Sequence, residues 1–369
     1  MEKTDVLIIG GGPAGASLSH FLKDKNINST VIERGGPERN KTCAGGLPIA
    51  VKSILPDYLQ DFKKVEYDSL QIIHKSGLQA SSSVKKVFTY GVLRAEFDAY
   101  LRNGLNVHYN ESFLTYEEEK EGVIATTNKG KYRAKFIVGA DGVGSRVSIV
   151  SGIAPKKRFI VAEEGEVPYK EKFNGTIRIF LGYNSIGYGW IFPKNGFLSV
   201  GSGAIRGRFK KDTVKKFFSG DYKTKIYPIS LWGGPENLTR GRVALVGEAA
   251  NLVDPFSAGG VYPAILSSYI LSGILEKALK TGSSKISGYE ELLESSIYED
   301  FRYALFLSRI FYPFIPVIKK YVIRQSTIDL ALELSSEGYI SYRNIYKKVE
   351  QSKHLPLKLA YLLIKKLFK

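Results

Sequence analysis

The feature that most constrains this chain is a glycine-rich turn near its N-terminus, Gly10-Gly11-Gly12-Pro13-Ala14-Gly15. Residues 5–9, before the turn, form a β-branched apolar run that predicts a buried strand, and residues 14–23 have the composition of a helix. A second apolar run over residues 28–33 predicts another strand. This order indicates a βαβ unit, and in Rossmann-like folds the turn of such a unit receives a phosphate.

The individual residues of this unit predict a dinucleotide. Gly10 permits the tight turn, Gly12 lets the backbone approach a pyrophosphate, and Gly15 allows the helix to pack closely on the strand. The helix N-terminus adds free N–H groups and a partial positive charge. Glu33 ends the second strand, where an acid accepts hydrogen bonds from the hydroxyls of an unphosphorylated ribose. A lone turn of this kind also links strands to helices without binding anything, so its context carries the prediction.

The net charge and the cysteine content limit the classes of partner and cofactor that we expect for this chain. The chain has 53 Lys and Arg against 36 Asp and Glu, and the net charge of +17 favours nucleic acid, acidic lipid surfaces or phosphorylated substrates. Cys43 is the only cysteine, which excludes an intrachain disulfide, and the four histidines lack metal-ligand spacing. We therefore expect no metal and a reducing, cytoplasmic setting. One cysteine and one methionine beside abundant lysine are also typical of thermophiles.

Three segments bear on membranes. The chain enters its first strand directly, so we expect no secretory signal. Tyr303–Ile323 is apolar but interrupted by charges and prolines, and no run reaches the ~20 residues of a spanning helix. Its first part, 303–318, predicts either a core helix or the lipid-facing mouth of a tunnel. His354–Lys369 predicts a basic amphipathic helix, which either lies peripherally on the inner membrane face or packs on the protein's own core.

The order of the predicted elements indicates two interleaved parts. After the βαβ unit, strands are predicted over 69–74 and 84–90, a helix from about Leu93, and then strands over 106–109, 113–118 and 136–139. From about 158 to 230 the pattern is antiparallel, with strands at Thr176–Leu181, Tyr188–Phe192 and Leu198–Gly203. Residues 242–247 then predict a buried strand that returns to the first part. From Val261 onward the patterns are helical.

Two further motifs resemble a known superfamily of flavoproteins. Gly139-Ala140-Asp141-Gly142-Val143-Gly144-Ser145 resembles the second FAD fingerprint of the p-hydroxybenzoate hydroxylase superfamily. Gly247-Glu248-Ala249-Ala250, followed by Asp254–Val261, resembles its third. Within the superfamily, Lys41–Leu47 and Tyr188-Gly189-Trp190-Ile191-Phe192-Pro193, with Val200–Gly203 after them, resemble the geranylgeranyl reductase family. The motifs span residues 5 to about 265, and the last hundred residues match none.

The resemblance implies a fold and its division. It implies a mixed α/β fold of the p-hydroxybenzoate hydroxylase type, in which a Rossmann-like FAD-binding domain is interleaved with an antiparallel-sheet substrate domain. We expect the FAD-binding domain over 1–65, 93–157 and 238–280, the substrate domain over 66–92 and 158–237, and a helical C-terminal region over 281–369.

The resemblance also implies the site, with FAD as cofactor. The expected cofactor-binding residues are Gly10, Gly12, Ala14, Gly15, Glu33, Arg34, Cys43, Ala44, Gly46, Arg94, Phe113, Asp141, Gly142, Glu248, Gly260 and Val261, and the expected substrate residues are Tyr188, Trp190, Phe192 and Pro193. Cys43 is the candidate proton relay or gate. By default, aromatics at alternate strand positions are core residues and a lone cysteine is a small buried residue, so these roles rest on the resemblance.

One position departs from the family pattern. Most relatives have Asp where this chain has Glu248, and the extra methylene moves the carboxylate by about 1.5 Å, the length of one bond. The contact to the ribityl chain of the cofactor must therefore be rebuilt or made through water.

The resemblance implies reduction of C=C bonds in polyprenyl groups of archaeal-type membrane phospholipids. The donor that reduces the flavin is external, and NAD(P)H, a deazaflavin and ferredoxin all stay open. Two alternatives also stay open: a flavin-dependent monooxygenase or halogenase, and a basic protein that binds nucleic acid or membrane and keeps a structural flavin. Dispersed lysines and the lack of a nucleic-acid-binding motif argue against nucleic acid as a partner.

Overall fold

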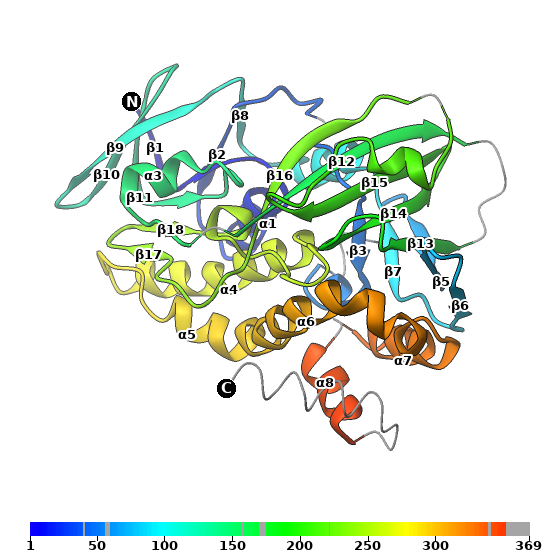
Figure 1. The fold of residues 1–369 in the computed structure, drawn as a ribbon. Coiled ribbons are helices and arrows are strands. Elements are labelled where there is room, and N and C mark those ends of the chain that lie inside the picture. The colour runs from blue at the N-terminus through cyan, green and yellow to red at the C-terminus, as the bar shows by residue number, and fades with distance from the viewer. Residues whose placement is uncertain are drawn as a thin grey trace.

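A computed structural model of the chain describes residues 1–39, 41–55, 60–156, 158–169, 175–220, 222–338 and 341–351. It contains two large β-sheets that lie side by side, with helices along one side of both (Figure 1). The expected mixed α/β fold is confirmed. The segment His354–Lys369, for which we predict a basic amphipathic helix, lies outside the described residues.

The first sheet has eight strands, and its centre is parallel. The order β17-β18-β11-β1-β2-β8 places β1 between β11 and β2, and β9 and β10 extend β11 as an antiparallel hairpin. The residues of β1 from Val6 to Ile9 are buried, as a strand covered on both faces requires. The strands are β1 Glu2–Ile9, β2 Ser29–Glu33, β8 Val107–Tyr109, β9 Phe113–Glu119, β10 Gly122–Thr127, β11 Lys131–Gly139, β17 Thr239–Arg240 and β18 Val243–Leu245.

Helices α1 (Pro13–Lys23) and α4 (Val261–Lys280) pack together beside this sheet. The Ser268 hydroxyl on α4 donates to the carbonyl of Ala14 on α1 at 2.8 Å. Helix α2 (Arg94–Arg102) begins within one residue of its predicted start at Leu93, and α3 (Arg146–Ser151) follows the second glycine motif. The glycine turn and both later motifs therefore meet at the carboxyl ends of the parallel strands, where open α/β sheets bind ligands.

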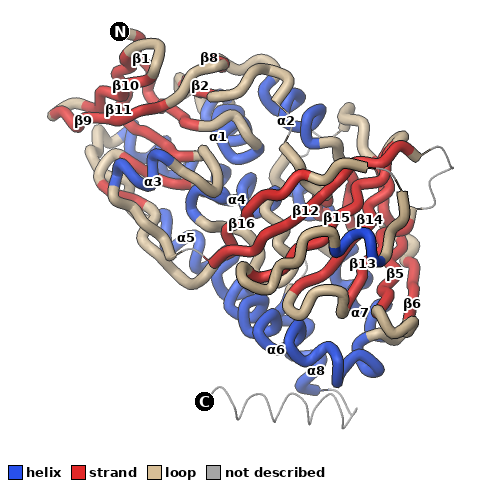
Figure 2. Tube along the Cα trace, turned by 45° about the horizontal axis from the view of Figure 1, so that its top comes forward, coloured by secondary structure: helices blue, strands red, loops and turns tan. Residues whose placement is uncertain are grey.

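The second sheet has seven strands in the order β16-β12-β15-β14-β13-β5-β6, all antiparallel except for the β13–β5 pair (Figure 2). Its strands are β5 Ser69–His74, β6 Gln79–Ser83, β12 Arg158–Pro168, β13 Thr176–Leu181, β14 Gly187–Lys194, β15 Phe197–Ile205 and β16 Lys225–Leu231. A small third sheet consists of β3 Gly46–Pro48, β4 Val65–Tyr67 and β7 Thr89–Gly91.

The strand predicted over 84–90 is wrong for most of its length, because only Thr89–Gly91 form β7. Residues 84–88 form an irregular connection, in which Lys85 and Lys86 are exposed. Strand β7 pairs with β3 and β4, and Gly91 lies against the ring of Tyr67. The alternation of apolar residues therefore gave a wrong prediction for residues 84–88, because an irregular loop with one buried side can show the same pattern as a strand.

The C-terminal part consists of α5 (Tyr289–Leu293), a π-helical turn (Glu294–Tyr298), α6 (Glu299–Val322), α7 (Gln325–Ser336) and α8 (Tyr342–Gln351). The continuous stretch Tyr289–Val322 is long and apolar enough to cross a membrane by length and composition, and 28% of its most apolar window is buried. One side of α6 faces the second sheet, whereas Phe314 and Val317 are 38% and 74% exposed. Residues 303–318 therefore lie in one helix, which has a buried side, as expected of a core helix, and an exposed apolar side, as expected of a surface that faces lipid.

The glycine turn gives a direct test of the packing. A Cβ at Gly15 would lie 1.9 Å from the carbonyl oxygen of Gly10, so Gly15→Ala forces α1 away from β1. We expect a loss of about 2–3 kcal/mol in the free energy of unfolding, typical of overpacking against a rigid neighbour. Thermal and denaturant unfolding of flavin-free protein measure it. Gly273→Ala on α4 is the matched control, because nothing lies within 4 Å of its Cβ. Equal stability of the two variants would contradict the argument.

Candidate active site

A cavity of about 1060 Å³ runs from the glycine turn to a chamber between the second sheet and helices α6 and α7. Its walls come from both large sheets and from the C-terminal helices, so a ligand inside would touch every part of the fold. Among the described residues, no group of three or more His, Cys, Asp or Glu is placed to hold a metal ion.

Most of the residues expected to bind cofactor or substrate line this one cavity. Those in its wall are Gly10, Gly12, Ala14, Glu33, Arg34, Cys43, Ala44, Gly46, Arg94, Phe113, Asp141, Gly142, Tyr188, Trp190, Phe192, Glu248, Gly260 and Val261. Gly15 and Pro193 are not in it. Gly15 packs behind the turn against Gly10, and Pro193 uses its carbonyl to accept a hydrogen bond from Tyr67 at 2.6 Å.

At the glycine turn, Glu33 braces the backbone. One carboxylate oxygen accepts from Gly11 N and the other from Gly35 N, both at 2.8 Å. Arg39 lies over the turn, with Nη1 3.3 Å from the position of a Cβ on Gly12 and 3.5 Å from the Glu33 carboxylate. This buried nitrogen has no hydrogen-bond partner in the described part of the chain. Arg39 is a site residue that sequence reasoning missed, because it follows Glu33 in an irregular loop with no spacing rule.

In the second motif, the carboxylate of Asp141 binds groups of its own segment. Asp141 accepts hydrogen bonds from the Ser145 hydroxyl at 2.6 Å and from the backbone N–H groups of Arg146 and Val147 at 2.6 and 3.2 Å. Burial raises the pKa of Asp141, and these hydrogen bonds oppose the rise. The side chain thereby caps α3, while Gly142, with φ of +79°, turns its backbone toward the cavity.

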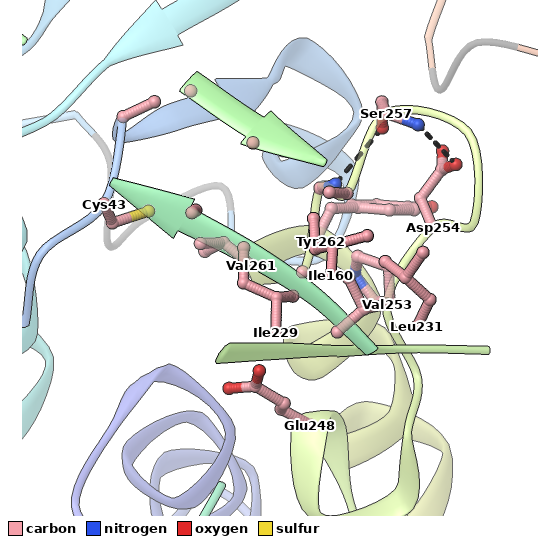
Figure 3. A pocket seen from close by; sticks show the side chains of 18 of the residues that line it. Cys43, Ile160, Ile229, Leu231, Glu248, Val253, Asp254, Ser257, Val261 and Tyr262 are labelled. Atoms are coloured by element: carbon pink, nitrogen blue, oxygen red, sulfur yellow. Dashed lines mark hydrogen bonds between the residues drawn. The ribbon is translucent and has the colours of Figure 1, made fainter. Parts of the chain in front are cut away.

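The departure at Glu248 has a structural consequence. One Glu248 oxygen forms an ion pair with Lys41 at 2.8 Å, and the other accepts from Ser230 N at 3.3 Å. Lys41 belongs to the segment that also holds Cys43, so the longer acid links the third motif to that loop. The carboxylate projects into the cavity beneath Ile229 and Val261 (Figure 3).

Cys43 lies in a loop that is held from several sides. Its sulfur accepts a hydrogen bond from Gly45 N at 3.4 Å, and its carbonyl accepts one from Lys194 Nζ at 3.2 Å. Arg94 lies nearby and forms a bidentate ion pair with Asp98 at 2.8 and 2.9 Å. Burial alone would lower the pKa of Arg94, but Asp98 and Cys43 outweigh it and the pKa is raised, so Arg94 is a fixed positive charge beside the sulfur.

Lys194 is the second residue that sequence reasoning missed. It is 3% exposed, directly follows the motif that ends at Pro193, and interacts with the buried carboxylate of Glu164. Burial raises the pKa of Glu164, and Lys194, Ser199 and Tyr227 oppose the rise. The Tyr227 hydroxyl donates to Glu164 at 2.8 Å, and its side chain lines the cavity. A charged residue inside an apolar strand was the sequence signal that was available.

Three tyrosines from separate elements hold the loop of the third motif. Tyr188 on β14 donates to Ser257 O at 2.5 Å and Tyr312 on α6 donates to Phe256 O at 2.8 Å, with their rings stacked at 6.2 Å. Tyr342 on α8 donates to the Asp254 carboxylate at 2.7 Å. Burial raises the pKa of Tyr342 and Asp254 adds to the rise, so the phenol stays a proton donor. Two of these anchors come from the region that carries no motif.

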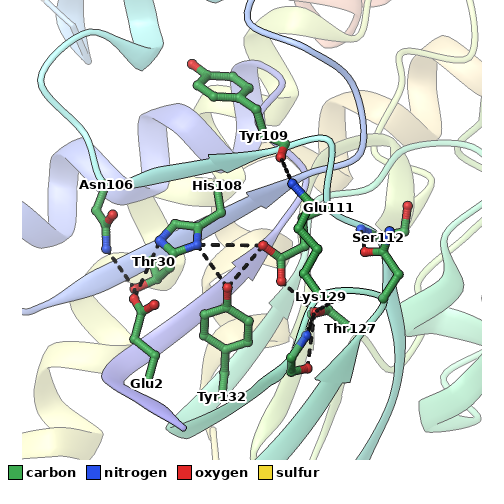
Figure 4. Close-up of polar contacts among 12 residues, drawn as sticks. Glu2, Thr30, Asn106, His108, Tyr109, Glu111, Ser112, Thr127, Lys129 and Tyr132 are labelled. Carbon is green, nitrogen blue, oxygen red and sulfur yellow. Dashed lines mark hydrogen bonds and ion pairs between the residues drawn. The ribbon is translucent and has the colours of Figure 1, made fainter.

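The end of the cavity near Phe113 and Glu111 is supported by a polar cluster (Figure 4). Glu111 is 2% exposed and accepts hydrogen bonds from Thr127 at 2.5 Å and Tyr132 at 3.1 Å. Burial raises the pKa of Tyr132, and Glu111 adds to the rise. His108 contacts the Tyr132 hydroxyl at 2.9 Å. The cluster fixes the connection between β8 and β9 beside the site expected for adenine.

The opposite end of the cavity is apolar. Ile160 on β12, Ile229 and Leu231 on β16 and Val253 meet there (Figure 3), and Ile310 and Phe311 on α6 close the chamber. These apolar side chains exclude water from this part of the cavity, whereas the glycine turn at the other end offers free N–H groups. The Arg39 nitrogen, which has no hydrogen-bond partner in the described part of the chain, and the uncapped helix N-terminus beside it fit a bound pyrophosphate, so the residues present suit a flavin dinucleotide.

Comparison with known proteins agrees with this geometry. Residues 4–172 match the pyridine nucleotide-disulphide oxidoreductase family. Digeranylgeranylglycerophospholipid reductase 3 of Methanosphaera stadtmanae is 27% identical over 343 residues, which covers 82% of this chain and 85% of that protein. The chloroplastic geranylgeranyl diphosphate reductase of Arabidopsis thaliana is 27% identical over 368 residues, covering 87% and 77%.

A solved structure supports the fold over the whole chain. The geranylgeranyl bacteriochlorophyll reductase-like protein of Thermoplasma acidophilum superposes with a TM-score of 0.79 at 21% identity, covering 98% of this chain and 100% of that one. Along most of its length this chain is similar to proteins named as geranylgeranyl reductases. It is a flavin-dependent oxidoreductase with the p-hydroxybenzoate hydroxylase-like fold expected from its sequence.

The bond between Lys194 and the Cys43 loop can be tested through the only cysteine. Lys194→Met removes the donor to the Cys43 carbonyl, and we expect alkylation of Cys43 by iodoacetamide to become about fivefold faster, the factor that a hydrogen bond of about 1 kcal/mol represents. Lys216→Met, at an exposed position, is the control. Mass spectrometry of the alkylated protein gives the rate, and an unchanged rate would show that Lys194 does not hold the loop.

Proposed function

We propose that this protein reduces C=C bonds in geranylgeranyl or other polyprenyl groups of archaeal-type membrane phospholipids, with FAD as its cofactor. The observation that carries the proposal is the continuous cavity, which joins an anion-binding turn to an apolar chamber past Cys43 and Tyr188. The names of the relatives from Methanosphaera stadtmanae and Arabidopsis thaliana support a prenyl substrate.

FAD, rather than a shorter flavin, is favoured by the length of the nucleotide half of the site. Gly12 and Arg39 suit the pyrophosphate, Glu33 suits the ribose, and Phe113 suits the adenine. The buried Nη1 of Arg39 lies 3.5 Å from the Glu33 carboxylate and 3.8 Å from that of Asp98 and has no hydrogen-bond partner in the described part of the chain, and a flavin with no adenosine part would leave it so.

Held by the residues of the glycine turn and of the two later motifs, a reduced flavin would supply the hydride for one alkene carbon, and the protein has to supply a proton for the other. The chain orients the prenyl group between the second sheet and α6 and excludes water with Ile160, Ile229 and Ile310. The Cys43 thiol, fixed by Gly45 N and by Lys194, is the candidate proton relay. Tyr188, Tyr312 and Tyr342 hold the loop at Gly260.

The donor that reduces the flavin is external to the chain and belongs to one of three classes: NAD(P)H, a reduced deazaflavin or a ferredoxin. We place the enzyme in the cytoplasm, at the inner face of the membrane where its lipid substrate lies. The exposed side of α6, with Phe314 and Val317, supports such a peripheral contact.

The function is tested by reducing the purified protein anaerobically and adding a geranylgeranylated glycerophospholipid. We expect reoxidation of the flavin and products heavier in steps of two hydrogens, measured by absorbance and mass spectrometry. Failure of both would exclude this substrate. Rapid consumption of oxygen and NAD(P)H that depends on substrate would instead favour a monooxygenase or halogenase, and turnover without oxygen would exclude that alternative.

The proposed role of Arg39 predicts a specific loss of affinity. For Arg39→Met we expect FAD to bind about 10- to 100-fold more weakly to the flavin-free protein, because a charge-assisted hydrogen bond contributes about 1.5–3 kcal/mol. Riboflavin has no pyrophosphate, so its affinity stays unchanged. Fluorescence titration measures both ligands, and Arg133→Met, on the surface of β11, is the control. An equal loss for riboflavin would remove Arg39 from the pyrophosphate site.

A further inference from the structure

Arg158 stands at one end of the apolar chamber. It is the first residue of β12 and shares a face with Ile160 and Ala162, all three of which line the cavity. Its register partner on β16 is Leu231, which lies beside Val253 in Figure 3. Same-face residues on a strand are about 7 Å apart, so the guanidinium group begins one such step beyond Ile160. A cation therefore ends a row of apolar side chains.

This arginine has no counter-charge. Its Nη1 atom is buried without a hydrogen-bond partner, and within the described ranges neither Arg158 nor Arg309 forms an ion pair. Burial lowers the pKa of Arg158, and the facing Arg309 on α6 lowers it further. An arginine keeps its proton in proteins, so the guanidinium remains charged and uncompensated. The burial of this charge costs free energy, and an anion bound to Arg158 in the cavity offsets part of that cost.

Further positive charge surrounds the same end of β12. Arg206 N donates to Phe159 O at 3.0 Å, which brings the basic loop 206–211 next to the first residues of the strand. Asp212, the acid after this loop, pairs with Lys215, and Glu236 accepts a hydrogen bond from Lys156 N at 3.3 Å. The Arg and Lys side chains of the loop 206–211 therefore add positive charge near the end of β12 at which Arg158 lies.

We propose that Arg158 binds the phosphate of the substrate's polar head and leaves the prenyl chain to lie along the apolar row. The inference rests on the proposed function. It assigns a binding site to the phosphate of the substrate, for which the proposed function names no residue. A planar guanidinium matches phosphate oxygens in a bidentate manner. The phosphate belongs either to a glycerophospholipid or to a free prenyl diphosphate, and both present the same chemistry to Arg158.

The decisive experiment compares prenyl ligands with and without phosphate. Binding of geranylgeraniol, geranylgeranyl diphosphate and a geranylgeranylated glycerophospholipid to the FAD-loaded enzyme is followed by tryptophan fluorescence, and KM and kcat are measured for each. For Arg158→Gln we expect about 10- to 100-fold weaker binding and higher KM for the phosphate-bearing ligands, with geranylgeraniol unaffected. Arg309→Gln, at an exposed position, gives a smaller effect in the same direction.

The control is Arg178→Gln, an exposed position on β13 between Ile177 and Ile179, two residues that line the cavity. Loss of affinity for the lipid alone, or for the diphosphate alone, identifies the natural source of the phosphate and supports the site. Unchanged affinity for both, or an equal loss for geranylgeraniol, overturns it. If no prenyl ligand is reduced the proposed function fails, whereas the binding comparison still decides the phosphate site. Arg309→Gln keeps the test open if Arg158→Gln does not fold.

Discussion

The contact between Gly15 and the Gly10 carbonyl is the constraint on which the nucleotide half of the site depends. Because no side chain lies between them, the start of α1 can pack closely on the end of β1. Gly247 allows a similar close approach, since a Cβ at this position would lie 3.0 Å from Ala14 and 3.1 Å from Ala264. Small residues therefore bring the first motif, the third motif and α4 to one point. Larger side chains there would separate the helix N-terminus from the strands that complete the site.

The substrate half is assembled in a different way, by polar bonds across an otherwise apolar space. Lys194 on the second sheet holds the Cys43 loop, and Lys41 ties that loop to Glu248 beside the first sheet. A partly exposed ion pair such as Lys41–Glu248 adds little to stability, but together with the hydrogen bond from Lys194 it restricts where the loop can lie. The position of Cys43 is thus set by both sheets at once, although neither sheet contains it.

The sequence predicted the parts of the site whose chemistry is local. Glycine spacing, a terminal acid and small-residue motifs have fixed relations to a backbone turn, so Gly12, Glu33 and Gly142 could be named in advance. Arg39, Tyr312 and Tyr342 could not, because they reach the cavity through tertiary packing and their neighbours in sequence look ordinary. Trp190 fits both the core role and the cavity role that the sequence left open. It lines the cavity, yet its ring packs over Gly201 and the residue is only 6% exposed, so it belongs to the core and to the cavity wall.

The tyrosine bonds to the loop of the third motif have a consequence for how the molecule is made. Tyr188 and the loop it holds are both present once about 70% of the chain has left the ribosome, whereas Tyr342 is added close to the end of the 369 residues. Domains generally fold in the order of their synthesis, so the nucleotide-binding sheet is formed well before Asp254 receives the hydrogen bond from Tyr342. A chain interrupted before α8 would carry every recognisable flavin motif and still lack the bond from Tyr342 to this loop, so the motifs alone do not make the loop as it is held here.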